Sequence, residues 1–194
     1  MTPLVLDQHG WLKPGPGLQH ARSPNCDARP AGCDPYLLVI HNISLPPGAF
    51  GGPEIIDLFL NRLDHASHPW LERLRGLTVS AHFLIRRDGG MVQFVSTDER
   101  AWHAGVSRFE ERERCNDFSI GIELEGTDTQ AYSDEQYSSL KALTRALRNR
   151  HPLRAVRGHE HIAPGRKTDP GPAFDWSRYG SESGWFRRQV PPQA

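Results

Sequence analysis

The chain has 194 residues, and its 23 lysines and arginines balance 23 aspartates and glutamates, so the formal charge at pH 7 is zero. This length favours one compact domain, and the balanced charge without a long Lys/Arg run argues against a nucleic-acid-binding protein. No stretch approaches the ~18 to 20 apolar residues that a membrane span needs. Ten histidines, 18 glycines and 16 prolines instead indicate ordered loops and a metal or acid–base site.

The N-terminal part of the chain is polar and rich in proline and glycine, which predicts an irregular arm over residues 1–35 that packs on the domain. The domain itself is expected to span 36–180, with a flexible C-terminal tail over 181–194. The first residues lack the charged leader and the apolar segment of a signal peptide, which favours a cytoplasmic protein.

Three cysteines, Cys26, Cys33 and Cys115, form no CxxC pair. An odd number of cysteines in a cytoplasmic protein favours free thiols, although a bridge between Cys26 and Cys33 is an alternative for an exported chain. The surroundings of Cys115 contain no nearby histidine in sequence, so we expect an unreactive or structural thiol there.

The first regular element is a short apolar run, Tyr36 to Ile40, which predicts a buried strand that ends directly on His41. A helix is expected to begin at Pro53, because several apolar residues then recur on one helical face. Two further strand-like runs, 79–85 and 91–95, are joined by an Asp-Gly turn signal and predict a β-hairpin.

The second half of the chain alternates strand-like and helical segments. Residues 118–124 alternate in polarity, with Glu123 opposite the apolar face. Ser133 and Gln136 form the pattern of a capping box at the start of a long amphipathic helix that ends before Pro152. After a short run and a Gly/Pro-rich loop, only a short helix is expected. Together these elements predict a single α/β (α+β) domain with a central mixed β-sheet flanked by helices.

Two histidines follow apolar runs: His41 after the first strand and His159 after the short run 153–157. Asp169, in the Gly/Pro-rich loop ten residues further on, is able to supply a carboxylate. Two neutral imidazoles and one carboxylate suit a catalytic Zn²⁺ ion, which keeps a fourth position for water and lowers the pKa of that water towards ~7. His161 would share a face with His159 in an extended segment, so spacing leaves the choice between them open.

The other histidines that we considered are expected to be structural or exposed. His82 lies inside an apolar run and is expected to be a core imidazole held by one hydrogen bond, with a supporting role near a metal as the alternative. The remaining ones lie in polar surroundings and are expected at the surface: His9, His20, His65, His68 and His151.

Glu123 is the candidate general base, because a carboxylate near an activated water can accept its proton. The alternative is an ion pair with an arginine such as Arg114, and Glu125 shares the same strand face. Lys167, two residues before Asp169, is the candidate cation for the oxyanion of a tetrahedral intermediate, with a solvated loop lysine as the alternative.

Five segments are specific enough to suggest a family: VIHNISLPPGAFGG (39–52), SAHFLIRRDG (80–89), AWHAGVS (101–107), RERCNDFSIGIELEGTD (112–128) and GHEHIAPGRKTDPGPAFDW (158–176). They closely resemble the amidase_2/peptidoglycan-recognition superfamily and, within it, the AmpD family of cytoplasmic 1,6-anhydro-N-acetylmuramyl-L-alanine amidases of Gram-negative bacteria. The resemblance covers roughly residues 10–179 and implies a zinc-dependent hydrolase of peptidoglycan recycling that cleaves the amide between the lactyl group of anhydro-muramic acid and L-alanine.

The resemblance also implies roles for individual residues. One Zn²⁺ per chain falls on His41, His159 and Asp169, which selects against His161. The base falls on Glu123 and the oxyanion cation on Lys167. Three further residues match motif positions that contact the substrate: Asn42, Trp102 and Arg114. The sequence departs from the family pattern at Thr78, Glu111 and His161, which bears on the finer substrate contacts.

The expected partner is a small-molecule muropeptide, with no nucleic acid and no membrane, and the protein is expected to be a monomer. A different class of function is a catalytically silent muropeptide-binding module, whose sequence would lack a metal ligand. An amidase acting on intact cell wall in the periplasm would need an export signal.

Overall fold

The computed structural model describes residues 3–192, so residues 1–2 of the expected arm and 193–194 of the expected tail lie outside the described part. The strands are β1 Leu18–His20, β2 Cys26–Ala28, β3 Leu37–Ile43, β4 Phe83–Ile85, β5 Met91–Gln93, β6 Glu99–Ala101, β7 Arg108–Phe109, β8 Arg112–Glu113, β9 Ser119–Glu125 and β10 Ala155–Gly158. The α-helices are α1 Glu54–Phe59, α2 Asp134–Arg150, α3 His159–Ile162 and α4 Trp176–Glu182. Short 3₁₀ helices cover His65–Ser67, Leu71–Leu74, Cys115–Phe118 and Arg187–Gln189.

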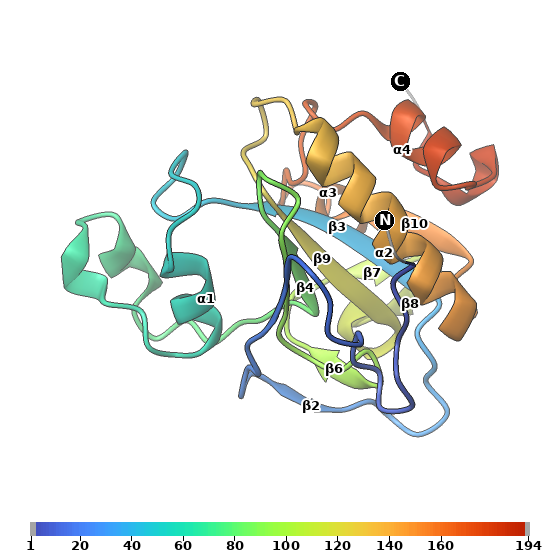
Figure 1. Ribbon diagram of the computed structural model, residues 1–194, viewed down its shortest axis with the longest axis horizontal. Coiled ribbons are helices and arrows are strands. Elements are labelled where there is room, and N and C mark those ends of the chain that lie inside the picture. The colour runs from blue at the N-terminus through green and yellow to red at the C-terminus, as the bar shows by residue number, and fades with distance from the viewer. Residues whose placement is uncertain (1–2, 193–194) are drawn as a thin grey trace.

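A six-stranded sheet in the order β1-β5-β4-β9-β3-β10 forms the centre of the molecule (Figure 1). Strands β10, β3, β9 and β4 run parallel, whereas β5 is antiparallel to β4. The central mixed sheet with flanking helices confirms the predicted fold class. In the register of β3 and β9, His41 lies opposite Glu123. Side chains paired in this way leave the sheet on the same face.

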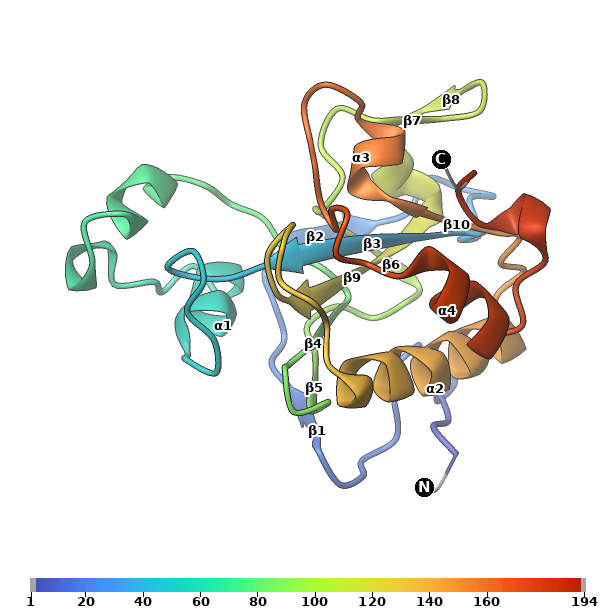
Figure 2. The ribbon, with the colours of Figure 1, turned by 90° about the horizontal axis from the view of Figure 1, so that it is seen from above.

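Different elements cover the two faces of the sheet (Figure 2). Helices α2 and α4 pack on one face, where Leu38 and Ile40 of β3 join a large apolar cluster with Leu140 and Tyr179. On the other face, α3 and the β7–β8 ribbon cover the intervening residues of β3. The connection from β3 to β4, which contains α1, projects beyond the carboxyl end of β3 (Figure 1). The sheet is therefore buried on both faces but open at this end.

Two local sequence signals are confirmed. The Asp-Gly segment joins the antiparallel strands β4 and β5, with Gly89 at a φ of 81° and the Gly90 amide donating to the Asp88 carboxylate. At the start of α2, the Gln136 amide donates to Ser133 Oγ while the Gln136 side chain accepts from the Ser133 amide. Both features form among residues close in sequence, which explains why the local sequence pattern predicts them.

The N-terminal segment is more regular than its composition predicts. β1 extends the main sheet by pairing with β5, and β2 pairs with β6. Leu12 is 1% exposed and joins the main core. Arg29 donates to four backbone carbonyls, those of Asn116, Asp117, Thr97 and Ser119. These long-range partners order a segment that has no pattern of its own.

Two element boundaries and one burial pattern also differ from the prediction. β3 does not end before His41 but continues to Ile43, because β9 pairs with it along its whole length. β9 is buried at every residue, polar positions included, since it lies between two strands and is covered on both faces. α1 ends at Phe59, although the apolar residues expected on its face continue to Leu63. Among the described residues, no helix is both long and apolar enough to cross a bilayer.

Candidate functional site

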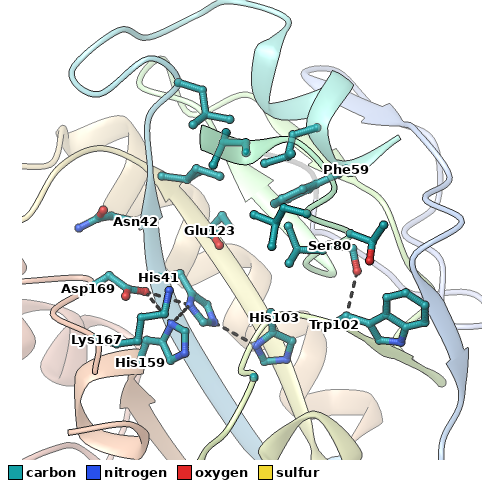
Figure 3. Close-up of a pocket in the computed structure, with 18 of the residues that line it drawn as sticks. His41, Asn42, Phe59, Ser80, Trp102, His103, Glu123, His159, Lys167 and Asp169 are labelled. Carbon is teal, nitrogen blue, oxygen red and sulfur yellow. Dashed lines mark hydrogen bonds and ion pairs between the residues drawn. The ribbon is translucent and has the colours of Figure 1, made fainter. Parts of the chain in front are cut away.

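Three side chains from distant parts of the chain converge beyond the sheet (Figure 3). His41 comes from β3, His159 is the first residue of α3, and Asp169 lies in the loop after α3. His41 Nδ1 lies 3.0 Å from His159 Nδ1 and 3.0 Å from Asp169 Oδ2, and His159 Nδ1 lies 3.1 Å from the same carboxylate oxygen. One potential ligand atom of each residue therefore points to a common position.

The alternative histidine points elsewhere. Because α3 is helical, His161 is turned by about 200° from His159 rather than lying on the same side. Its Nδ1 accepts from the Gly158 amide at 3.0 Å, and its ring packs edge-on against Trp176. The geometry thus removes His161 from the cluster.

The donor set fits a divalent cation. His159 Nε2 lies 3.0 Å from the Ala104 carbonyl, which can only accept, so the neutral ring carries its proton on Nε2 and presents a lone pair at Nδ1. That lone pair faces a carboxylate oxygen across 3.1 Å, an arrangement that is unfavourable without a cation between them. Ligand atoms that share a tetrahedral zinc lie about 3.3 Å apart, close to the spacing of this cluster.

Burial and charge set the protonation states that a cation needs. The pKa of His41 falls to about 4, because burial and the neighbouring His159 both disfavour the imidazolium. Burial would raise the pKa of Asp169, but its contacts with His159 and His41 outweigh burial and hold that pKa below its usual range. Near pH 7 the cluster therefore offers a neutral imidazole and a carboxylate, as metal binding requires.

Glu123 lies beside this cluster on β9, in register with His41 (Figure 3). Glu123 is 9% exposed, and within residues 3–192 its Oε2 has no hydrogen-bond partner. Burial, together with the charge of Asp169, raises the pKa of Glu123 well above its usual value. A buried carboxyl with a raised pKa and a free oxygen is suited to exchanging a proton with a reacting group.

The structure also decides the two alternatives for β9, an ion pair of Glu123 with Arg114 and a role for Glu125 in place of Glu123. Arg114 does not pair with Glu123, and its Nε lies 3.6 Å from Asp117. Glu125 is buried but accepts hydrogen bonds from the amides of Gly51 at 2.7 Å and Arg87 at 3.0 Å. Glu125 therefore fixes two loops, whereas Glu123 Oε2 accepts no hydrogen bond from the described residues.

A cleft of about 480 Å³ opens over the cluster. Glu123, Lys167 and the three converging side chains line one end. The opposite wall is apolar and comes from the connection that contains α1, with Leu58, Phe59, Leu74 and Leu77. Such a cleft accepts a ligand with both polar and apolar parts.

The remaining candidates occupy different places. Lys167 is exposed and enters the cleft from the Asp169 loop (Figure 3). Trp102 lies at the far end of the cleft from Asp169. Asn42 lines the cleft, but its Nδ2 donates to Asp128 at 2.8 Å and to the Pro170 carbonyl at 3.1 Å, which ties the Asp169 loop to β3. Arg114 lines a neighbouring hollow instead, with 72% of its side chain exposed.

Two histidines lie in surroundings that the sequence did not predict. His151 was expected at the surface, but it is 8% exposed and its Nε2 lies 2.9 Å from Thr97 Oγ1, because α2 ends against the N-terminal half of the chain. His103 was not singled out, yet its Nδ1 lies 3.0 Å from His41 Nε2. The one feature of the sequence that could have indicated a role for His103 is its place in the segment 101–107, which resembles the family, because spacing does not relate His103 to His41. His82 is fully buried as expected, and its Nδ1 accepts from the Gly121 amide.

The thiols agree with expectation. Cys26, Cys33 and Cys115 are all free. Cys115 is fully buried, and burial raises its pKa to about 11, which makes it a poor nucleophile.

Comparisons with known proteins point to one family. The family model described as N-acetylmuramoyl-L-alanine amidase (Amidase_2) matches residues 32–172. The 1,6-anhydro-N-acetylmuramyl-L-alanine amidase AmpD of Escherichia coli K12 is 58% identical over 177 residues, which cover 90% of this chain and 95% of that protein.

Solved structures agree with the sequence matches. A crystal structure of an AmpD derivative superposes with a TM-score of 0.87 at 56% identity and covers 92% of this chain and 98% of that one. The E. coli amidase AmiD, in complex with the substrate anhydro-N-acetylmuramic acid-L-Ala-D-γ-Glu-L-Lys, gives a TM-score of 0.56 at 26% identity, with 95% of this chain and 67% of that one covered.

Proposed function

The chain belongs to the N-acetylmuramoyl-L-alanine amidase family, and from this premise we propose that it is a zinc-dependent amidase of anhydro-muropeptides. The bond that it hydrolyses is the amide between the lactyl group of 1,6-anhydro-muramic acid and L-alanine. His41, His159 and Asp169 would hold one Zn²⁺ ion. The observation that carries the proposal is the convergence of this donor set beside Glu123, whose Oε2 has no hydrogen-bond partner in the described part of the chain.

When bound, zinc supplies a Lewis acid that polarises the amide carbonyl and lowers the pKa of water. Glu123 takes a proton from the attacking water as the oxygen–carbon bond forms. It passes the proton to the alanine nitrogen as the carbon–nitrogen bond breaks, so no covalent enzyme intermediate is needed. The buried carboxyl of Glu123 holds the proton between the two transfers.

Lys167 and the cleft walls position the reacting amide. The Lys167 ammonium lies at the same end of the cleft as Glu123, where it stabilises the negative charge that develops on the carbonyl oxygen. Asn42 keeps the Asp169 loop on β3, and Trp102 supplies a flat surface for the sugar or peptide at the other end. Arg114, in the adjoining hollow, provides a cation for a carboxylate of the stem peptide.

The relatives support the choice of substrate. AmpD of E. coli is named for 1,6-anhydro-N-acetylmuramyl-L-alanine, and the AmiD complex contains an anhydro-muropeptide. We therefore propose a role in peptidoglycan recycling. From the sequence we further propose a cytoplasmic monomer that acts on a soluble muropeptide. The apolar wall of the cleft suits the anhydro-sugar, which has fewer hydroxyl groups than an ordinary muramic acid.

Zinc content and product formation test this function together. Protein purified without chelator is expected to contain about one zinc per chain and to release the peptide from anhydro-muropeptide but not from intact peptidoglycan, as followed by mass spectrometry. A chelator should stop the reaction, and added zinc should restore it. His41→Ala should lose the metal, whereas the matched control His161→Ala should keep it.

The same experiment separates the enzyme from a catalytically silent muropeptide-binding module. A module binds the muropeptide equally well with and without metal and releases no product. Release of peptide from intact peptidoglycan at a similar rate would refute the substrate assignment and leave the amidase chemistry in place.

A further inference from the structure

Each imidazole of the cluster makes a second hydrogen bond on the side away from Asp169. His41 Nε2 lies 3.0 Å from His103 Nδ1, and His159 Nε2 lies 3.0 Å from the Ala104 carbonyl. The two partners, His103 and Ala104, are consecutive residues between β6 and β7, and the proposed reaction gives neither of them another task. One short segment therefore provides the hydrogen-bond partners of both Nε2 atoms, those of His41 and His159.

The direction of the first hydrogen bond follows from the groups behind His103. The Ser119 hydroxyl donates to the Cys115 carbonyl at 2.5 Å, so its proton is already used. At 3.2 Å from His103 Nε2, the same oxygen can then only accept, which puts the proton of a neutral His103 on Nε2. His103 Nδ1 is left with a lone pair and accepts from His41 Nε2.

The consequence for His41 is a single tautomer. A neutral His41 that donates through Nε2 has no proton on Nδ1, so its lone pair points to Asp169 and His159. His159 is held in the same tautomer by the Ala104 carbonyl. Without an acceptor at His103, a proton on His41 Nδ1 would instead donate to the Asp169 carboxylate, and a metal would have to displace it.

Contacts with neighbouring residues also fix the position of the His103 ring. Asn116 Oδ1 accepts from the amides of His103 at 3.1 Å and Ala104 at 2.8 Å. Arg166 donates to the Ala104 carbonyl at 2.9 Å. The ring lies over Gly121, where a Cβ atom would come within 2.5 Å of it.

We propose that His103 is a positioning residue that, through its Nδ1, keeps the proton of His41 on Nε2 and so presents His41 Nδ1 to the metal. The proposal rests on the proposed function only in taking zinc as that metal. A partner of this kind behind a ligating histidine typically changes metal affinity by ~10- to 100-fold.

Two substitutions of equal size isolate the hydrogen bond. His103→Asn keeps a carbonyl oxygen near the position of Nδ1, whereas His103→Leu has the same shape without an acceptor. Zinc affinity is measured by competition with a chromophoric chelator, without substrate. We expect His103→Leu to bind zinc ~10- to 100-fold more weakly and His103→Asn to stay within a few-fold of the wild type.

Nitrogen-15 NMR of the histidine rings in the metal-free protein reads the tautomer directly. His41 should carry its proton on Nε2 in the wild type and in His103→Asn, and should become a mixture in His103→Leu. Ser119→Ala, which removes the group that orients His103, should shift His41 in the same direction. This variant keeps the inference testable if His103→Leu does not fold.

Equal zinc affinity in His103→Leu and in the wild type would overturn the inference. It would also be overturned if His103→Asn bound zinc as weakly as His103→Leu, because altered packing alone would then explain the lower affinity. If the wild type binds no zinc, the proposed function fails, while the NMR comparison still decides the role of His103. A wild-type His41 that carries its proton on Nδ1 would refute that role directly.

Discussion

Replacing Glu123 by glutamine should separate catalysis from stability. The substitution keeps the size of the side chain but removes its ability to accept a proton. Loss of a general base costs ~10²- to 10⁴-fold in kcat, or roughly 3 to 5 kcal/mol of barrier. Because Glu123 lies outside the His41, His159 and Asp169 cluster, bound zinc should stay at the wild-type level.

The same change should stabilise the metal-free protein. The folded-state pKa of Glu123 lies above its unfolded value, because burial and Asp169 disfavour the charge. Between those two pKa values the folded protein binds more protons, so the unfolding free energy of the wild type falls as pH rises. The glutamine side chain of the variant does not titrate. The advantage of Glu123→Gln should therefore be small below the unfolded pKa of about 4.3 and should grow as pH increases above it.

Glu125→Gln is the matched control on the same strand. Glu125 accepts from two backbone amides, those of Gly51 and Arg87, and a glutamine can accept from only one of them with its carbonyl oxygen. One buried N–H then faces an NH₂ group, which should cost about 1 to 3 kcal/mol of stability. Since Glu125 does not line the cleft, kcat should change less than tenfold in the folded protein.

Urea unfolding of chelator-treated protein from pH 5 to 8 measures the stabilities, and release of alanine-linked peptide from zinc-loaded protein gives kcat. The expected pattern is opposite in the two variants: Glu123→Gln is more stable and inactive, and Glu125→Gln is less stable and active. A Glu123→Gln enzyme with near-normal kcat would refute the base assignment. A stability difference that does not change with pH would refute the raised pKa.

Three further outcomes follow from the structure. Lys167→Ala should lower kcat by about 10²- to 10³-fold while zinc content is unchanged, and turnover near the wild-type rate would exclude the oxyanion role. Ser133→Ala should lower the unfolding free energy by about 1 kcal/mol in urea titrations, because the Gln136 amide loses its cap and the Arg87 carbonyl loses a donor. Cys115 should react with an aromatic disulfide reagent only after unfolding, since it is buried and its pKa is raised to about 11; rapid labelling in the native protein would contradict this.

Several parts of the fold could be predicted because their interactions are local. The capping box of α2 joins Ser133 to Gln136, and the β4–β5 turn closes around Asp88 and Gly89. The mixed sheet followed from the alternation of strand-like and helical segments. In the capping box and the turn the interacting residues lie within a few positions of each other, and the helices and strands of the sheet are each marked by their own periodicity, so a short window of sequence contains the cause.

Other parts depend on distant contacts and carried no local signal. β1 forms because β5 offers it a free edge, although its own sequence is polar and short. His151 is buried because Thr97, 54 residues earlier, approaches it. The burial of every residue in β9 likewise depends on two neighbouring strands and two covering layers. Polarity patterns describe one face of one element and cannot include such neighbours.

For the site, the sequence by itself determined the chemistry available: imidazoles after strands, a carboxylate in a Gly/Pro-rich loop, and an acidic residue on a central strand. Only the tertiary structure decided which of them meet. The helical turn of α3 turned His159 inward and His161 away, and the register of β3 with β9 placed Glu123 beside His41. His41 and Asp169 are 128 residues apart, and His103 reaches His41 from 62 residues away. Hydrogen bonds over such separations form only when the sheet is assembled, so the tautomers of the histidines are a property of the fold.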